Sequence, residues 1–192
     1  MIPNSIKKLV DFFTRLPSLG PRQAIRLAFY LANWTKNDLR EFGESLKMLE
    51  NLKICPNCNF PHENKDEICN ICSDPNRQKN IIALVEKTTD LITLEQSKNF
   101  WGTYFVVHDF KKGQSNLQNL KTRIEKDLGG QIEEIILAIS PTTYGDINAD
   151  IMINELKNHA KKITRLGRGI PTGGEIEFAD EDTIKSAFDN RK

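Results

Sequence analysis

The sequence lacks any long apolar segment. No stretch of its 192 residues approaches the roughly 18–20 consecutive apolar residues that a membrane-spanning helix needs. The first residues, MIPNSIKKLVDFF, contain neither the long apolar core nor the small-residue cleavage site of a secretory signal peptide. We therefore expect an intracellular protein with no membrane partner.

A strong charge of either sign is also missing, as is a nucleotide-binding loop. The formal net charge is only +1, and 39% hydrophobic with 28% charged residues is the composition of a globular rather than a disordered chain. No G-x-x-x-x-G-K-S/T sequence is present, so nothing obvious would cradle the phosphates of ATP. The total charge alone argues against a nucleic-acid-binding protein, because such proteins usually carry a basic excess.

The charge is unevenly distributed, however. Residues 1–54 contain nine basic and five acidic side chains, which gives this segment a net charge of +4 and leaves −3 for the rest of the chain. An electrostatic face for phosphate, if the protein has one, therefore lies in the N-terminal quarter.

Cysteine is scarce, and all four cysteines fall within 18 residues as two C-x-x-C pairs, Cys55 with Cys58 and Cys69 with Cys72. In a reducing compartment this spacing favours a metal site over disulfides. Four thiolates close a tetrahedral zinc shell, so we predict one structural Zn²⁺ per chain. A redox dithiol is the alternative, although nothing around the cysteines resembles a thioredoxin-type strand and helix. His62 lies between the pairs, and we interpret it as a loop residue rather than a ligand.

Two amphipathic helices are predicted in the basic segment, around residues 6–13 and 24–31, with the turn L-P-S-L-G-P-R at 16–22 between them. This is the helix-hairpin-helix arrangement. The alternative is a plain helical hairpin that serves only for packing. A third helix follows, and its apolar stripe consists of Leu39, Phe42, Leu46 and Leu49.

The hairpin turn has the chemistry of a phosphate site. Gly20 allows a phosphate to approach the backbone closely, and the proline after it suits the first turn of a helix whose free N–H groups attract anions. Arg22 and Arg26 are four residues apart on one face of that helix and add positive charge. The predicted DNA-binding residues are Arg22, Arg26, Gly20, Lys7 and Lys8.

Strands and helices alternate after the cysteines. Strands are predicted at 81–85, 103–107, 134–139 and 162–166, and helices at 88–100, 115–128 and 146–160. Such alternation indicates a small parallel sheet with helices on both faces and a working site at the carboxyl ends of the strands. The residues expected at that edge are Glu86, His108, Asp109 and the loop at 140–146. We interpret His108 as a loop or packing residue.

The chain closes with a predicted glycine turn, a strand and a helix. Gly173 and Gly174 form the turn, and Ile176 and Phe178 alternate on one side of a short strand. Asp180 or Asp182 then caps the terminal helix.

This order of parts, with the closing run T-R-L-G-R-G-I-P-T-G-G-E-I-E-F-A-D-E-D-T-I at 164–184, resembles the RecR family of bacterial recombination mediators over essentially the whole chain. The resemblance implies a multidomain α+β protein. Its parts are a helix-hairpin-helix region at 1–54, a four-cysteine zinc finger at 55–77, an α/β Toprim domain with a parallel sheet at 80–175, and a C-terminal strand and helix at 176–192 that contact other subunits.

The resemblance also implies a function in recombinational DNA repair. Proteins of this family form ring-like oligomers on DNA and work with RecO, and in some settings RecF, to help RecA load onto single-stranded DNA. For this chain we accordingly expect sequence-independent contact with the DNA backbone, a tetrameric ring, RecO-like and RecF-like partners, and a cytoplasmic, nucleoid-associated location.

Whether the chain is an enzyme depends on its carboxylates. Catalytic Toprim proteins hold Mg²⁺ with a glutamate after the first strand and an Asp-x-Asp pair after the third. Here Glu86 is present, but the third loop has only Asp146 and, one turn later, Asp150. The family loop is typically P-T-x-E-G-E, and this chain has Tyr144 and Asp146 at its two glutamate positions.

We therefore assign no catalytic residue and expect Glu86 and Asp146 to form an acidic surface for protein partners. The alternative is a Mg²⁺-dependent nuclease or topoisomerase-like enzyme that uses the same two carboxylates. A purely structural zinc protein is a third possibility, but it would leave the basic hairpin unexplained.

Overall fold

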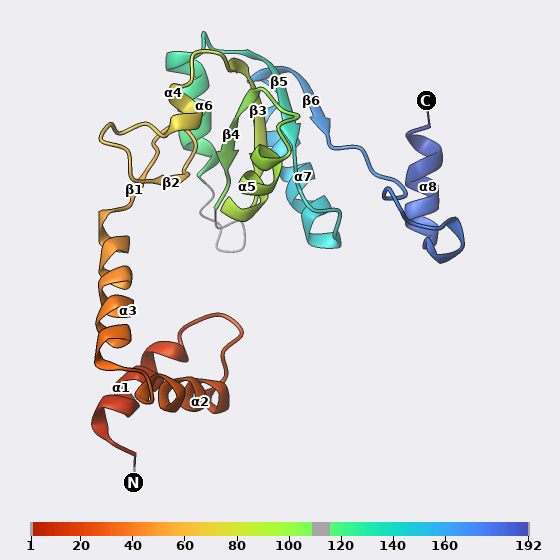
Figure 1. Cartoon of the computed structure of the whole chain (residues 1–192). Helices are drawn as coiled ribbons and strands as arrows, with labels where there is room; N and C mark the ends of the chain where they lie inside the picture. Colours follow the sequence, from red (N-terminus) through yellow and green to blue (C-terminus); the bar gives the residue numbers. More distant parts are fainter. Residues whose placement is uncertain (1, 109–115, 192) are drawn as a thin grey trace. The chain divides into compact units, whose positions relative to one another are not determined.

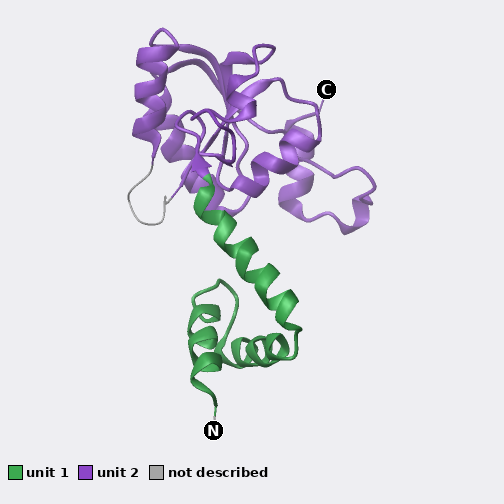
Figure 2. Ribbon diagram, turned by 60° about the vertical axis from the view of Figure 1, so that its left-hand side comes forward, with its two compact units in different colours: residues 1–52 green, residues 53–192 purple. Residues whose placement is uncertain are grey.

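The computed structural model describes residues 2–108 and 116–191, which belong to two compact units, residues 1–52 and 53–192 (Figure 2). Asp109, which we expected at the edge of the sheet, lies outside the described residues. Among the helices of the described part, none is long and apolar enough to cross a membrane.

The N-terminal unit is helical. Its elements are α1 (Asn4–Phe13), α2 (Pro21–Ala32), α3 (Lys36–Met48) and a 3₁₀ turn at Leu49–Asn51 (Figure 1). A capping box starts α3, because the Thr35 hydroxyl accepts a hydrogen bond from the Asp38 N–H and the Asp38 carboxylate accepts one from the Thr35 N–H.

This helical unit has a small core. Ile6 is buried on α1, and Ala24, Ala28 and Leu31 are buried on α2. Because the two alanines have short side chains, α1 and α2 pack closely against each other. The apolar stripe predicted for α3 is present but not buried, and Leu46, for example, is 53% exposed.

The cysteine segment opens the second unit. Two short strands, β1 (Lys53–Ile54) and β2 (Pro61–His62), pair antiparallel, and a single helical turn, α4 (Asn70–Ser73), follows. These elements place the first C-x-x-C pair between β1 and β2 and the second at α4.

A four-stranded sheet forms the centre of the second unit. All strands are parallel, in the order β4-β3-β5-β6, and the strands are β3 (Gln78–Val85), β4 (Gly102–Val106), β5 (Ile132–Leu137) and β6 (Ala160–Arg165). The chain thus leaves β3 toward one side, to β4, and returns to the other side at β5. In sheets of this kind ligands bind at the carboxyl ends of the strands where the order reverses. Glu86 follows β3 at that point.

Helices cover both faces of the sheet, as the sequence predicts. The connecting helices are α5 (Thr88–Gln96), α6 (Leu117–Asp127) and α7 (Thr143–Leu156). Along β3, Ile82 and Leu84 pack with α6 and α7, whereas Ala83 and Val85 face the other way and pack with Leu91 of α5. This period of two is expected for a strand that is buried on both faces.

Helices α5 and α7 differ in their boundaries from the sequence-based prediction, and α7 ends at Leu156 rather than near residue 160. Helix α5 ends at Gln96 rather than near residue 100, because Lys98 takes the left-handed conformation with φ of 56° and cannot continue the helix. The predicted end of α6 is confirmed, since Gly129 and Gly130 have φ of 79° and 85°.

Helix α7 begins three residues earlier than predicted. Thr142 caps it, because its hydroxyl accepts a hydrogen bond of 3.1 Å from the Gly145 N–H. A Cβ at Gly145 would collide with the carbonyl oxygen of Ser140, so this tight turn requires glycine. The cap brings Asp146 into the first turn of α7.

The strand predicted near the C-terminus is wrong. Residues Ile176–Phe178 form a 3₁₀ turn, and Ile176 and Phe178 are 71% and 78% exposed. Local hydrogen bonds, from Phe178 N–H to Glu175 O and from Ala179 N–H to Ile176 O, replace strand pairing. The terminal helix α8 (Glu181–Asp189) is confirmed, and Asp180 is its cap.

Candidate functional site

The four cysteines form one buried cluster. The sulfur atoms of Cys55, Cys58, Cys69 and Cys72 all lie within 4.8 Å of one another. Zinc–sulfur bonds of about 2.3 Å in a tetrahedron separate the sulfurs by about 3.8 Å. The sulfurs of Cys58 and Cys69 are 3.5 Å apart, so the donor set fits a tetrahedral metal ion.

Each cysteine pair is part of a tight turn. In the first, Asn59 adopts a left-handed conformation with φ of 61°, and its N–H donates to the Cys55 carbonyl at 2.8 Å. The Cys55 N–H donates to the Phe60 carbonyl at 3.0 Å, which closes the turn. In the second, the Ser73 N–H donates to the Cys69 carbonyl at 3.0 Å. Both turns aim two sulfurs at the same point.

Hydrogen bonds between the thiols shift the pKa values of Cys55 and Cys58 in opposite directions. The bonds from Cys58, Cys69 and Cys72 hold the pKa of Cys55 well below its usual range, whereas the bond with Cys55 raises the pKa of Cys58. The thiolate is the form that binds metal, so an ion that binds this cluster displaces the thiol protons.

His62 is a structural residue of the loop between the two turns. It is buried, its Nδ1 accepts a hydrogen bond of 3.2 Å from the Asn64 N–H, and its Nε2 donates to the Glu67 carbonyl at 3.1 Å. Both ring nitrogens are therefore engaged in the loop. This arrangement supports the interpretation of His62 as a loop residue.

The hairpin turn joins α1 to α2 in the helical unit. Ser18 has a φ of 65°, Gly20 precedes the helix as its N-cap, and Pro21 is the first helical residue. A Cβ at Gly20 would meet no atom within 4 Å, and its φ is −80°, so neither packing nor backbone conformation requires glycine there. The space in front of this backbone is open.

Arg22 and Arg26 lie on the free face of α2. At about 100° per residue they are roughly 40° apart around the helix, and the buried Ala24 and Ala28 are about 200° further round. Both arginines are exposed, and within residues 2–108 and 116–191 no carboxylate pairs with them. Lys7 and Lys8 are exposed on α1.

The two predicted acidic residues each contact a side chain of the sheet unit. The Asn148 amide donates to Glu86 at 2.6 Å. Arg165 donates to Asp146 at 2.7 Å, and Arg168 forms a second ion pair with the same carboxylate. Hydrogen bonds from Arg168 and Arg165 lower the pKa of Asp146 to about 2. Glu86 and Asp146 are thus held by different partners, a neutral amide in one case and two guanidinium groups in the other.

Among the described residues, the cysteine cluster is the one group of three or more ligand side chains that lies close enough to hold an ion. His108 is exposed after β4, as expected for a loop residue. An open cleft of about 1270 Å³ lies at the carboxyl edge of the sheet, and its lining includes Asp146, Asp150, Arg165 and Arg168 together with residues of α8.

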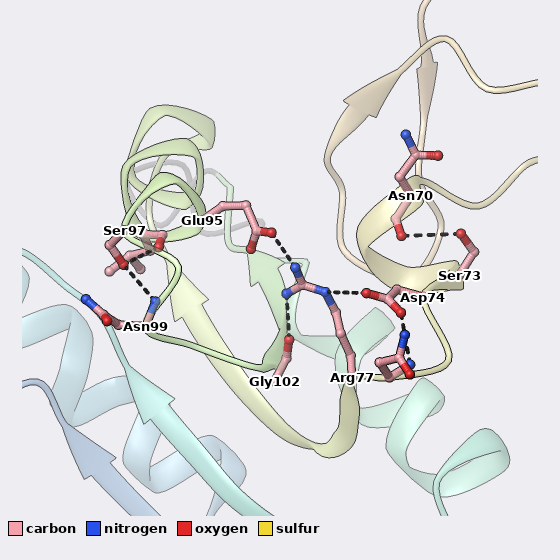
Figure 3. A network of polar contacts seen from close by, with 10 residues as sticks. Asn70, Ser73, Asp74, Arg77, Glu95, Ser97, Asn99 and Gly102 are labelled. Carbon is pink, nitrogen blue, oxygen red and sulfur yellow. Dashed lines mark hydrogen bonds and ion pairs between the residues drawn. The ribbon is translucent and has the colours of Figure 1, made fainter.

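Sequence reasoning missed the arginines of the sheet unit. Arg165 and Arg168 belong to the closing run. Their pairing with Asp146 joins residues that are about 20 positions apart, and no local sequence pattern predicts it. Arg77 is similar. Its buried side chain donates to the Gly102 carbonyl at 3.0 Å and pairs with Glu95 and Asp74 (Figure 3). It thereby joins the end of the cysteine segment to the sheet.

Two family models match the chain. The model described as "Toprim domain" matches residues 80–167, which contain the parallel sheet, and the model described as "RecR, C-terminal" matches residues 169–192. Two relatives from strains of Clostridium perfringens, each named "Recombination protein RecR", are 37% identical to this chain over 194 residues. The alignment covers 98% of this chain and 96% of each relative.

Proposed function

Because the chain belongs to the RecR family of recombination proteins, we propose that it is a non-enzymatic, DNA-binding mediator of recombinational DNA repair. In this role it acts with a RecO-like protein, and in some settings a RecF-like protein, to promote RecA loading on single-stranded DNA. We place this activity in the bacterial cytoplasm, at the nucleoid.

The observation that carries the DNA-binding part is the free arginine face of α2. Arg22 and Arg26 point away from the packing face, and the open backbone at Gly20 leads directly into the free N–H groups of the helix start. Lys7 and Lys8 add charge in the same helical unit. Such contacts are made to the phosphate backbone and not to the bases, so the binding is sequence-independent.

The cysteine cluster holds one structural Zn²⁺ in this proposal. Cys55, Cys58, Cys69 and Cys72 fill all four tetrahedral positions, which leaves no open position for water. The ion cross-links the two turns and stabilises the fold. The cysteines take no part in chemistry on DNA.

Glu86 and Asp146, which we call the acidic edge, serve as a partner surface rather than a magnesium site. Phosphoryl transfer requires carboxylates that converge on a cation. The positive charge beside Asp146 comes instead from Arg165 and Arg168, and Glu86 is held by a neutral amide on α7. This arrangement favours a protein-facing role for Glu86 and Asp146 over the alternative of a nuclease or topoisomerase-like enzyme.

The C-terminal segment forms subunit contacts in a ring-like tetramer. Ile176, Phe178 and Phe188 are large apolar side chains that the second unit leaves mostly exposed. Apolar surface of this kind is stabilised when a neighbouring protein covers it.

The decisive experiment measures DNA binding and DNA integrity together, with and without Mg²⁺, on the purified full chain. We expect binding with intact DNA in both conditions. The double variant Glu86→Ala/Asp146→Ala should bind DNA as well as the wild type or slightly better, because it repels phosphate less, but should lose association with a RecO-like protein.

The control variant Glu63→Ala/Asp66→Ala removes the same charge from an exposed loop and should keep that association. Mg²⁺-dependent nicking by the wild type that the Glu86→Ala/Asp146→Ala variant lacks would make the protein an enzyme and overturn the proposal.

A further inference from the structure

The first cysteine turn lies against the outer edge of the sheet. β4 is the edge strand in the order β4-β3-β5-β6. The Val107 N–H points inward and donates to the Val85 carbonyl of β3 at 2.8 Å, so the polar groups of Val106 point outward. An outward edge of this kind is normally unpaired.

The cysteine turn pairs that edge. The Val106 N–H donates to the Cys58 carbonyl at 2.9 Å, and the Val106 carbonyl accepts a hydrogen bond of 3.1 Å from the Asn59 amide. Together with a bond of 2.9 Å from the Asn116 amide to the same carbonyl, these two bonds take the place of a neighbouring strand at the carboxyl end of β4, and the Val106 N–H depends on the cysteine turn. They connect a metal ligand directly to the sheet.

A buried arginine holds the same turn from a helix. Arg123 of α6 is only 8% exposed, and its guanidinium donates to the Asn57 carbonyl at 2.6 Å. Burying a guanidinium costs free energy unless a partner compensates for the lost water. Asn57 lies between the two cysteines of the first pair, so this partner is the backbone of the turn itself.

Apolar packing fuses the cysteine cluster with the sheet. Phe60 and Ile71 pack against the four cysteines and also against the face of the sheet that contains Ala83, Val85 and Tyr104. A change in the position of the turn therefore alters the packing on the sheet face as well as the hydrogen bonds at its edge.

We propose that Arg123 and Asn59 are positioning residues that couple occupancy of the metal centre to the carboxyl end of β4. This inference rests on the metal binding proposed above. When the four thiolates hold an ion, the first turn is fixed and covers Val106. When the ion is removed, the turn is released, and the edge of the sheet opens beside Val85, which precedes Glu86.

The first test compares amide hydrogen exchange in the zinc-loaded and chelator-treated full chain. We expect the Val106 amide to be protected with zinc and to exchange much faster without it. The Ala138 amide, which donates to the Leu84 carbonyl at 2.9 Å inside the sheet, serves as the internal control and should change far less.

The second test measures the rate of zinc release to a colorimetric chelator. Substitution of residues that orient metal ligands typically weakens metal binding by about 10- to 100-fold, and we expect Arg123→Gln to accelerate release to a similar extent. Asn59→Gly keeps the left-handed turn, because glycine tolerates positive φ, but removes the bond to Val106. It should accelerate release less, by about threefold to tenfold.

Two matched variants control these measurements. Lys121→Gln removes a charge from the same helix, where Lys121 pairs with Glu155 instead of the turn. Lys98→Gly makes the same left-handed replacement at an exposed position with φ of 56°. Both controls should release zinc at the wild-type rate. If Arg123→Gln fails to fold, the zinc-release rate of Asn59→Gly and the wild-type exchange data decide whether the coupling exists.

The outcomes separate the two proposals. A wild-type chain that binds no zinc overturns the metal proposal and this coupling with it. A zinc-loaded wild type whose release rate is unchanged by Arg123→Gln and Asn59→Gly, or whose Val106 amide is equally protected without zinc, overturns the coupling alone.

Discussion

Arg22 and Arg26 of the helical unit have no carboxylate partner among the described residues, whereas Asp146 of the sheet unit is held by both Arg165 and Arg168. A ligand that binds the unpaired arginines need not displace an existing ion pair. A ligand for Asp146 must compete with two guanidinium groups. The exposed arginines of α2 are therefore open to a strongly negative ligand, which in our proposal is DNA, whereas the proposed partner at Asp146 would have to engage the carboxylate and the arginines together.

The two units also differ in how they are stabilised. The helical unit buries little more than Ile6, Leu31 and two alanines, and α3 buries none of its side chains. The sheet unit has two extensive apolar clusters and a third that consists of the cysteines. Loss of the proposed metal should therefore destabilise the sheet unit, while changes on the exposed face of α2 should alter DNA binding with little effect on folding.

The largest effect is expected from removing a metal ligand. Cys58→Ser or Cys72→Ser should lose zinc and lower the melting temperature of the sheet unit strongly, because the binding energy of a structural zinc is largely folding energy. Metal analysis combined with thermal unfolding measures this. Structure in α1 and α2 should persist in the variant. A zinc-free variant with an unchanged melting temperature would contradict the assignment.

A smaller effect is expected on the basic face. Arg22→Ala with Arg26→Ala should weaken DNA binding similarly for all sequences and reduce the slope of log affinity against log salt by about one to two, since each phosphate contact releases roughly one counterion. Binding titrations at several salt concentrations provide the measurement.

The matched control for this variant is Lys36→Ala with Arg40→Ala, an exposed pair with the same four-residue spacing on α3. It removes the same charge from the same unit and should leave the salt slope closer to that of the wild type. Equal slopes for both double variants would mean that α2 has no special role.

The smallest effect concerns the ion pairs of Asp146. Its pKa in the folded chain is about 2, below the ordinary value of 3.8, so its contribution to stability is present above about pH 4 and disappears as the pH falls toward 2. The side chain is 46% exposed, and solvent screening limits the contribution to about 1 kcal/mol or less. Urea unfolding can be measured from about pH 5 down to about pH 2. Over this range the free energy of unfolding should fall more steeply for the wild type than for Asp146→Asn. Parallel curves would refute this.

Local patterns in the sequence were sufficient for much of this molecule. The C-x-x-C spacing predicts the cysteine cluster, because each pair is closed by its own turn, and the role of His62 is decided by residues within the same loop. The alternation of strands and helices predicts a parallel sheet, since each strand is a short apolar run between amphipathic helices.

The missed features are ones that the pattern of residue types does not specify, whether they are local or join distant residues. Ile176 and Phe178 alternate as a strand does, but a strand also requires a neighbour, and local hydrogen bonds form a 3₁₀ turn instead. The left-handed conformation of Lys98 has no signature in its residue type. The pairing of Arg123 with Asn57 joins residues 66 positions apart, which no local pattern reveals.

The hydrogen bonds between the first cysteine turn and β4 have a consequence for dividing the chain into fragments. A peptide that ends soon after the second cysteine pair would lack both Val106 and Arg123, so its first turn would lose the backbone and guanidinium contacts that hold it. A fragment that begins at β3 would expose the outer edge of β4, a template for pairing with another chain. The cysteine segment and the sheet should therefore be expressed together.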